Sequence, residues 1–153
     1  MNRPQEVTIL LVEDDPGHAR LIEKNLRRAN ISNEIVNVTN GQQALDYLFA
    51  KGSFSHIDTS KPLLLLLDLN LPVLDGYQVL QTLKTDERTK HIPVIILTTT
   101  GDTREISRCY EIGCCIYITK PVNYQQFCDA IHKLGLFLSV VSVPEGSIRY
   151  AHI

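Results

Sequence analysis

The sequence predicts an α/β fold in which a five-stranded parallel sheet is doubly wound with helices, and two observations lead to this prediction. Five short apolar segments recur along the chain, and most are unbroken runs, which are typical of strands buried on both faces of a parallel sheet. After each run, apolar residues recur at helical spacing. Strand and helix therefore alternate five times, and right-handed crossovers are expected to place helices on both faces of the sheet.

The predicted strands are the apolar runs themselves, which cover residues 8–12, 35–38, 63–67, 94–97 and 116–118. The helices that follow them share apolar positions that fall on one helical face. These positions are Ala19, Ile22, Leu26 and Ala29; Ala44, Leu45 and Leu48; Leu80 and Leu83; the segment 106–112; and Phe127, Ile131, Leu134 and Leu138. Residues 51–61, ahead of the third strand, are irregular and are expected to form a polar surface loop.

The chain is long enough for one folded domain but too short for two of average size. It has 153 residues, of which 44% are hydrophobic and 21% are charged. We expect one domain over residues 1–138, followed by a C-terminal extension over residues 139–153. A net charge of -2 provides none of the clustered basic excess that nucleic acid or anionic lipid would attract, so neither partner is expected.

The sequence predicts neither export nor membrane insertion. The polar residues 1–6 lead straight into an apolar run, which is the wrong order for a secretory signal. The apolar run 63–67 is far shorter than the roughly 20 residues that span a bilayer. We therefore expect a soluble cytoplasmic protein. Its four cysteines include no C-x-x-C pair and its histidines no pair at metal-ligand spacing, so reduced thiols are expected rather than a zinc site.

Polar residues follow four of the predicted strands. Glu13 and Asp14 follow the first, Asp68 the third, Thr98 the fourth and Lys120 the fifth. In open α/β sheets chemistry gathers beyond the carboxyl ends of the strands, so we expect these residues at one edge. Three clustered carboxylates would raise the pKa of at least one of them unless a cation neutralises the group. Mg²⁺ fits, because it binds one or two carboxylates and also accepts phosphate oxygens.

Asp68 is the predicted nucleophile of this group. Carboxylates form acyl phosphates in covalent phosphoryl transfer, where the protein mainly supplies positioning and charge neutralisation. Lys120 would offer a cation to the phosphoryl oxygens, and Thr98 would offer a hydroxyl donor. The sequence therefore predicts a magnesium-dependent phosphoacceptor.

These residues also form a recognisable set. Glu13-Asp14, Asp68, Thr98, Tyr117 and Lys120-Pro121 lie in this order at successive strand ends. The set resembles the complete active site of the receiver domains of bacterial two-component response regulators, and the similarity covers residues 8–138.

The resemblance implies features that the residues alone do not establish. The sheet would be flavodoxin-like, with strand order 2-1-3-4-5. The backbone carbonyl of Asn70 would join the three carboxylates as a ligand of Mg²⁺, and the peptide bond before Pro121 would be cis. Thr98 and Tyr117 would form a switch, in which the hydroxyl moves toward the phosphoryl group and the ring turns inward. A sensor histidine kinase would donate the phosphoryl group, so the chain would be a signalling protein rather than an enzyme.

A narrower resemblance rests on the long loop before the third strand and on segments 67–72, 115–120 and 140–144. These features are similar to those of the small response regulators paired with cyanobacterial and bacterial phytochrome histidine kinases, which makes a phytochrome the expected partner. Residues 134–141 are apolar nearly all round, which together with this resemblance predicts a homodimer. Since only residues 139–153 follow the fifth helix, output is expected through protein contacts.

Other interpretations of the same residues stay open. The acidic run 13–15 before Pro16 could simply begin a helix, and Asp75-Gly76 is interpreted as a turn that the backbone freedom of glycine permits. Asp68 would also suit an aspartate-nucleophile phosphatase, but Asn70 stands where a second aspartate would act as general acid. A receiver-like scaffold that is never phosphorylated is the other rival, although every expected active-site side chain is present.

Overall fold

The computed structural model of the protein describes residues 7–28, 31–98, 103–113, 116–120, 125–126 and 129. Its strands are β1 (Thr8–Val12), β2 (Ile35–Val38), β3 (Leu63–Asp68), β4 (Val94–Thr98) and β5 (Ile116–Thr119). Its helices are α1 (Pro16–Arg28), α2 (Gly41–Leu48), the 3-10 helix η1 (Gly52–Phe54), α3 (Gly76–Thr85) and α4 (Thr103–Ile112). The predicted bounds of the first two strands are confirmed, and each of the other three strands ends one residue later than predicted.

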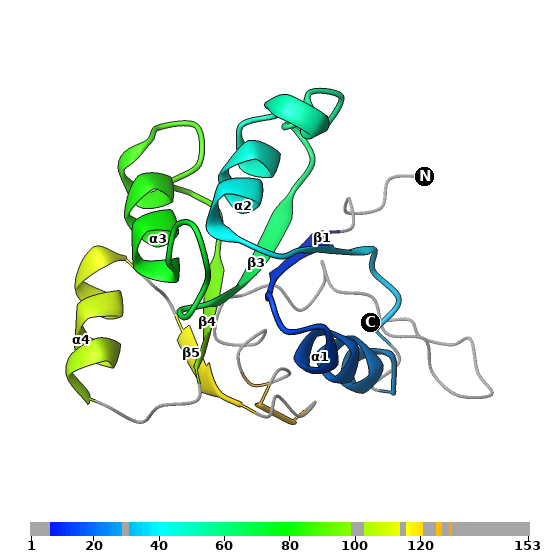
Figure 1. The fold of residues 1–153 in the computed structure, drawn as a ribbon, viewed down its shortest axis with the longest axis vertical. Helices are drawn as coiled ribbons and strands as arrows, with labels where there is room; N and C mark the ends of the chain where they lie inside the picture. The colour runs from blue at the N-terminus through cyan, green and yellow to red at the C-terminus, as the bar shows by residue number, and fades with distance from the viewer. Residues whose placement is uncertain are drawn as a thin grey trace.

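All the strands run parallel, in the order β2-β1-β3-β4-β5. This confirms the predicted doubly wound sheet and its strand order. Figure 1 shows α1 on one side of the sheet and α2 and α3 on the other. None of the helices within the described ranges is long and apolar enough to cross a membrane.

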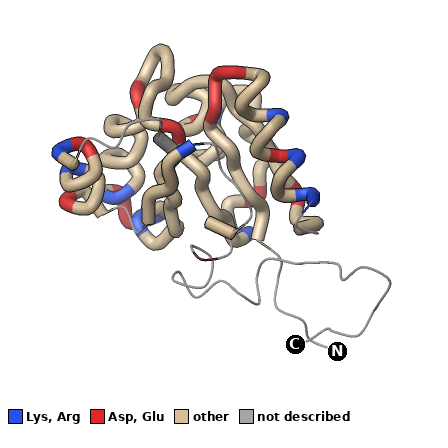
Figure 2. The backbone as a smooth tube through the Cα atoms, turned by 90° about the horizontal axis from the view of Figure 1, so that it is seen from below, with Lys and Arg blue, Asp and Glu red and all other residues tan. Residues whose placement is uncertain are grey.

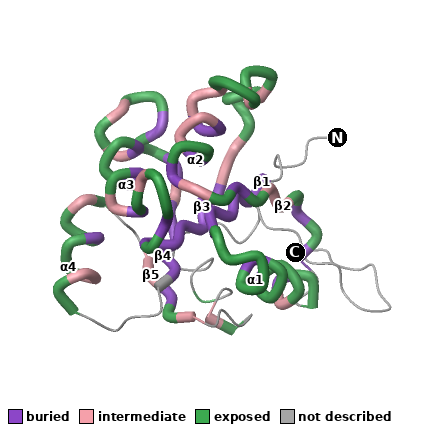
Figure 3. Tube along the Cα trace, in the orientation of Figure 1, coloured by how far each residue is buried: buried purple, intermediate pink, exposed green. Residues whose placement is uncertain are grey.

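The core consists of two apolar clusters, one on each face of the sheet. In β3, Leu64 and Leu66 belong to the cluster that contains residues of α1, whereas Leu65 and Leu67 belong to the cluster that contains residues of α2 and α3. Successive side chains of a strand point to opposite faces, so a strand covered on both faces must be apolar throughout. Figure 3 shows the buried sheet between helices whose outer surfaces are exposed.

The apolar positions that predict a fifth helix, Phe127, Ile131, Leu134 and Leu138, lie outside the described residues, and so do residues 139–153. Three of the four cysteines also lie outside them. The fourth, Cys109 of α4, is a buried free thiol whose pKa is raised by burial.

The segment 51–61 is not the purely polar surface loop that the sequence predicts. It contains η1, and Phe54 and Ile57 pack against the core cluster that contains residues of α2. The ring of Phe54 meets that of Tyr47 edge-on, with the ring centroids 5.2 Å apart. Two isolated apolar residues show no periodicity, which is why the sequence did not indicate that they anchor this loop.

Gly76 begins α3 in direct contact with the last residue of β3. A Cβ at Gly76 would lie 2.4 Å from the backbone oxygen of Asp68, closer than real contacts allow. The φ of Gly76 is not positive, so the glycine is required for space rather than for an unusual backbone angle. Asp75 before it caps α3 and forms a capping box with Gln78. The interpretation of Asp75-Gly76 as a turn was therefore wrong: the pair starts a helix that packs on the backbone of Asp68.

We expect Gly76→Ala to lower the free energy of unfolding by about 1–3 kcal/mol, because the added methyl group overpacks a contact between two backbones. Urea denaturation with an unchanged m value is the measurement. Gly17→Ala is the matched control: Gly17 also lies in the first turn of a helix, but its Cβ would approach only the Asp15 carboxylate, at 3.2 Å. This control should be neutral or mildly stabilising, since alanine favours helix. Equal urea midpoints for Gly76→Ala and the wild type would contradict the prediction.

Candidate functional site

The register of the sheet brings the predicted site residues to one edge. Val12 pairs with Leu67, so Glu13 and Asp68, which come next in their chains, lie side by side. On the other side of β3, β4 and β5 end at the same edge, and Lys120 directly follows β5. Acidic and basic side chains from distant parts of the sequence therefore meet beyond the carboxyl ends of the strands.

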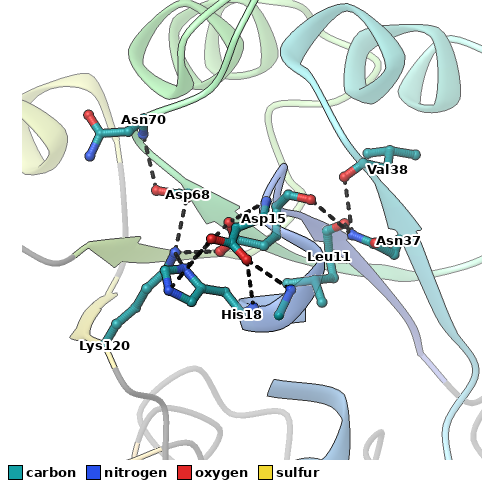
Figure 4. Close-up of polar contacts among 10 residues, drawn as sticks. Leu11, Asp15, His18, Asn37, Val38, Asp68, Asn70 and Lys120 are labelled. Atoms are coloured by element: carbon teal, nitrogen blue, oxygen red, sulfur yellow. Dashed lines mark hydrogen bonds and ion pairs between the residues drawn. The ribbon is translucent and has the colours of Figure 1, made fainter. Parts of the chain in front are cut away.

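Lys120 bridges two buried carboxylates. Its Nζ donates to Oε1 of Glu13 and to Oδ2 of Asp68, the second bond being 3.0 Å long and visible in Figure 4. The side chains of Lys120, Asp68 and Glu13 are only 8%, 7% and 1% exposed. The other oxygen of Asp68, Oδ1, accepts a hydrogen bond from the backbone N–H of Asn70 at 3.0 Å. Both oxygens of Asp68 are thus held by donors, and its orientation is fixed.

Asp14 completes an acidic cluster with Glu13 and Asp68. Each of the three offers a ligand oxygen, and these oxygens lie within 4.8 Å of one another. At that separation two carboxylates repel each other by on the order of 3 kcal/mol in an effective dielectric of about 20. Figure 2 shows the acidic run that precedes α1.

The cluster suits a divalent cation in both charge and ligand type. The ammonium of Lys120 offsets the charge of one of the three carboxylates. The two negative charges that remain would balance the two positive charges of Mg²⁺ or Mn²⁺. Carboxylate oxygens are the ligands that these hard cations prefer. The residues present therefore fit the predicted magnesium site.

The pKa values of Glu13 and Lys120 reflect the cost of burying their charges. Burial raises the pKa of Glu13, the hydrogen bond from Lys120 lowers it and the charge of Asp68 raises it, with a net increase. Burial lowers the pKa of Lys120, but its hydrogen bonds to Glu13 and Asp68, together with the negative charges of these two carboxylates, raise the pKa by more, so the ammonium stays charged. The prediction that one carboxyl of the cluster has a raised pKa is confirmed, although burial is the largest cause.

Asp15, the third acidic residue of the run, caps α1. Its Oδ1 accepts hydrogen bonds from the backbone N–H groups of Gly17 at 2.8 Å and His18 at 3.1 Å. The helix begins at Pro16, as expected for a proline in the first turn. Both interpretations of the acidic run are therefore correct, for different residues: the first two join the cluster, and the third starts the helix.

Asn37 of β2 supports the turn that carries the acidic residues, and the sequence did not indicate it. Its Nδ2 lies 3.0 Å from the backbone oxygen of Leu11, 3.4 Å from that of Glu13 and 3.2 Å from that of Val38 (Figure 4). An exposed asparagine in an edge strand carries no periodic signal. Its role depends on the carbonyls of Leu11 and Glu13, which only the folded sheet brings to it.

His18, in the first turn of α1, is a second site residue that the sequence did not indicate. Its Nδ1 lies 3.4 Å from Nζ of Lys120 and 3.9 Å from Oε2 of Glu13. Metal-ligand spacing does not reveal this histidine. The available signal is its position, since the first turn of the helix after β1 lies at the carboxyl edge of the sheet.

The loop after β3 contains a strained residue near the site. The backbone N–H of Leu74 donates to the oxygen of Pro72 at 2.8 Å, which closes a γ-turn around Val73, whose φ is 70°. Positive φ is a genuine outlier for a β-branched residue. The side chain of Val73 is 74% exposed, so little burial compensates for this strain.

Four of the predicted site residues are thus brought together: Glu13, Asp14, Asp68 and Lys120. Thr98 is the last residue of β4 and reaches the same edge, but its side chain lies outside the described part of the chain, as does Pro121. The cis peptide bond before Pro121 therefore stays a prediction.

Tyr117 and Asn70 are placed only in part. Tyr117 is half-buried in β5, and its ring meets that of Tyr110 in α4 edge-on, with centroids 6.3 Å apart. Its role in a switch stays a prediction. Asn70 donates its backbone N–H to Asp68, while its side chain points away from Asp68 in Figure 4. Coordination of a metal by the Asn70 carbonyl also stays a prediction.

Known proteins are similar to this chain in sequence and fold. A family model described as the response regulator receiver domain matches residues 9–132. The response regulator Rcp1 of Synechocystis sp. is 34% identical over 137 residues, which are 89% of this chain and 92% of Rcp1. A crystal structure of the Mn²⁺-bound form of Rcp1 matches with a TM-score of 0.70 and 33% identity, over 92% of this chain and 99% of that one.

Two solved structures extend the comparison to phytochrome response regulators. The bacteriophytochrome response regulator AtBRR matches with a TM-score of 0.81 and 41% identity, over 88% of this chain and 96% of that one. The phosphorylated cyanobacterial phytochrome response regulator RcpA matches with a TM-score of 0.72 and 35% identity, over 87% of this chain and 94% of that one. The predicted resemblance to phytochrome response regulators is confirmed.

We expect Val73→Asn to raise the free energy of unfolding by about 1 kcal/mol, because asparagine adopts positive φ more readily and strain of this kind costs about 1–3 kcal/mol. The measurement is the urea midpoint at constant m. Val36→Asn, in strand β2 and without a positive φ, is the matched control and should be destabilising. A midpoint for Val73→Asn at or below that of the wild type would show that the turn is not strained.

Proposed function

Since this chain belongs to the response regulator receiver domain family, we propose that it accepts a phosphoryl group on Asp68 and changes shape in response. The observation that supports this most directly is the environment of Asp68. Its carboxylate is buried at the end of the central strand β3, is held by Lys120 and by the backbone of Asn70, and adjoins two further carboxylates. A carboxylate fixed in this way is a suitable phosphoryl acceptor.

The phosphoryl donor in this proposal is the phosphohistidine of a sensor histidine kinase. A carboxylate oxygen of Asp68 attacks the phosphorus in line, and the new P–O bond forms as the P–N bond to the kinase histidine breaks. Lys120, already 3.0 Å from Asp68, supplies positive charge to the phosphoryl oxygens. Thr98, at the end of the neighbouring strand, supplies a hydroxyl donor.

The groups that would hold Mg²⁺ are Glu13, Asp14, Asp68 and the backbone carbonyl of Asn70. Bound Mg²⁺ neutralises the carboxylates and the oxygens of the transferred group. The manganese ion named for the Rcp1 structure supports a divalent cation at this site. The chain itself contributes the alignment: the sheet register brings the carboxylates together, and the ammonium of Lys120 offsets the repulsion between Glu13 and Asp68.

The signal is proposed to pass from Asp68 to α4 by way of Thr98 and Tyr117. An acyl phosphate adds charge and acceptor oxygens at the sheet edge, so Thr98 moves toward it and Tyr117 turns inward. The edge-on contact between Tyr117 and Tyr110 supports this route, because a rotation of the first ring must displace it from the second. Output then takes the form of altered contacts with other proteins rather than catalysis on a separate substrate.

A phytochrome-type histidine kinase in the cytoplasm is the proposed upstream partner. The names of AtBRR and RcpA tie both of these relatives to phytochromes, which supports this choice. The proposal keeps the receiver domain at residues 1–138 and the extension at 139–153, with a homodimer formed through the apolar segment 134–141. The dimer rests on the sequence alone, since this segment lies outside the described residues.

The phosphatase alternative loses support from the placement of Asn70. A general acid must approach the leaving group beside Asp68, but the Asn70 side chain is exposed and points away from it (Figure 4). The scaffold alternative predicts an unreactive Asp68 and is decided by labelling.

Incubation with phosphoramidate and Mg²⁺ should add one labile phosphoryl group to the wild type, visible by intact mass. Asp68→Asn should remove the adduct entirely, because the nucleophilic carboxylate is gone. Asp58→Asn, in the exposed loop before β3, is the matched control and should label like the wild type. An adduct on Asp68→Asn would assign the chemistry to another residue, and no adduct on the wild type would favour the scaffold.

Asp14→Asn should raise the free energy of unfolding without Mg²⁺ and reduce the increase that Mg²⁺ produces. Without the metal the variant should be more stable by on the order of 1 kcal/mol, because one of three repelling carboxylates is removed. With Mg²⁺ it should gain less than the wild type, since a ligand at a hundred times its Kd stabilises a folded protein by about 2.7 kcal/mol. Urea midpoints at matched ionic strength test both parts, and an equal gain from Mg²⁺ in the two proteins would place the metal elsewhere.

A further inference from the structure

His18 lies at the open side of the site, against the lysine that bridges the carboxylates. Its Nδ1 is 3.4 Å from Nζ of Lys120, and its side chain is 49% exposed, whereas that of Lys120 is only 8% exposed. Figure 4 shows the imidazole next to the lysine, at the start of α1. The histidine therefore covers the ammonium from the side of the solvent.

Lys120 contacts three acceptors, and His18 differs from the other two. An ammonium has three donors and no acceptor, so a favourable contact with Nδ1 requires the lone pair of the ring nitrogen to accept. In the proposed reaction Glu13 becomes a metal ligand and Asp68 becomes the acyl phosphate. Of the three acceptors recorded for Lys120 among the described residues, the imidazole is thus the one whose bonding the reaction leaves unchanged.

The imidazole is itself held in place by the start of α1. The backbone N–H of His18 donates to Oδ1 of Asp15 at 3.1 Å, and Nε2 lies 3.9 Å from Oδ2 of the same carboxylate. The cap uses the backbone of His18 and not its ring. Replacement of the ring should therefore leave the helix start intact, and the shortest contact that it removes is the one with Lys120.

We propose that His18 is a positioning residue for phosphoryl transfer, which keeps the ammonium of Lys120 aligned with the phosphoryl group while its two carboxylate partners change roles. This inference rests on the proposed phosphorylation of Asp68. It concerns the speed of that reaction and not the identity of the acceptor. Without the Nδ1 contact the lysine samples other positions, and fewer encounters with a donor are productive.

The test is the rate of phosphorylation by phosphoramidate at saturating Mg²⁺ for three variants of His18. His18→Ala should slow labelling by about fivefold, the scale of losing one weak hydrogen bond to a charged group. His18→Asn should recover most of the rate, because its Oδ1 occupies the place of Nδ1. His18→Gln should not, since its amide reaches the place of Nε2. His56→Ala, at an exposed histidine in the loop before β3, is the control and should match the wild type.

Two further readouts separate positioning from a general structural effect. In a Lys120→Gln background, His18→Ala should change the remaining rate by less than about twofold, because the group it aligns is absent. The Mg²⁺ concentration for half-maximal rate should change by less than about twofold, since Nδ1 of His18 lies 3.4 Å from Nζ of Lys120 but 3.9 Å from the proposed metal ligand Glu13, beyond hydrogen-bond distance. Equal rates for His18→Ala and the wild type, or no recovery with His18→Asn, would overturn this inference alone. A wild type that takes no phosphoryl group would overturn the proposed function as well.

Discussion

The ammonium of Lys120, set between the buried carboxylates of Glu13 and Asp68, is the interaction on which the rest of the site depends. Isolated charges of this kind are costly to bury, and removal of one partner from a buried ion pair typically costs about 3–5 kcal/mol. The sheet causes this repulsion between carboxylates, because its register places Glu13 and Asp68 side by side at the ends of two central strands. The sheet also offsets the repulsion, because β5 ends at the same edge and places Lys120 between the two carboxylates. The core and the site therefore depend on the same strand pairing, which buries the leucines of β3 and also brings the charged groups together.

The backbone of Asp68 is linked to α4 by a continuous series of contacts. Gly76 lies against its carbonyl, and the next residue, Tyr77, donates its hydroxyl to Oε1 of Glu105 in α4 at 3.0 Å. The guanidinium of Arg108 lies 4.2 Å from the centre of the Tyr77 ring and adds a second contact between α3 and α4. Burial and the bond to Glu105 raise the pKa of Tyr77, so its hydroxyl remains a donor at neutral pH.

A series of contacts is not yet coupling, which also requires an element with two arrangements. In the proposed mechanism that element is Tyr117, which reaches α4 from the side of the sheet through Tyr110.

The sequence predicts the sheet well and the connections poorly, for a physical reason. A strand covered on both faces must be apolar at every position, so residues 63–67 and the other apolar runs can be recognised as strands without tertiary information. The ends of the strands then place Glu13, Asp14, Asp68 and Lys120 by topology alone. Gly76, His18 and Asn37 act through contacts between separate elements of the fold, and a single sequence carries no signal for these distances. Asp15 shows the same limit within one motif, since three adjacent acidic residues look alike until the helix begins and separates the cap from the cluster.

In the proposed mechanism the site passes through two successive states of charge, which explains why a lysine is preferable to an apolar residue at position 120. Well-packed apolar side chains can be as stabilising as a buried ion pair, so stability alone does not favour the lysine. A fully neutralised cluster would have no affinity for a divalent cation, whereas a cluster without the lysine would leave three carboxylates to repel each other and would take up protons. One ammonium against three carboxylates leaves a negative charge that a divalent cation can balance. In the proposed reaction a phosphoryl group adds negative charge beside Lys120, and the same ammonium then turns from the carboxylates to the new oxygens without leaving its place. The repulsion within the acidic cluster and the proposed reactivity of Asp68 thus have a common origin in the number and position of these four charges.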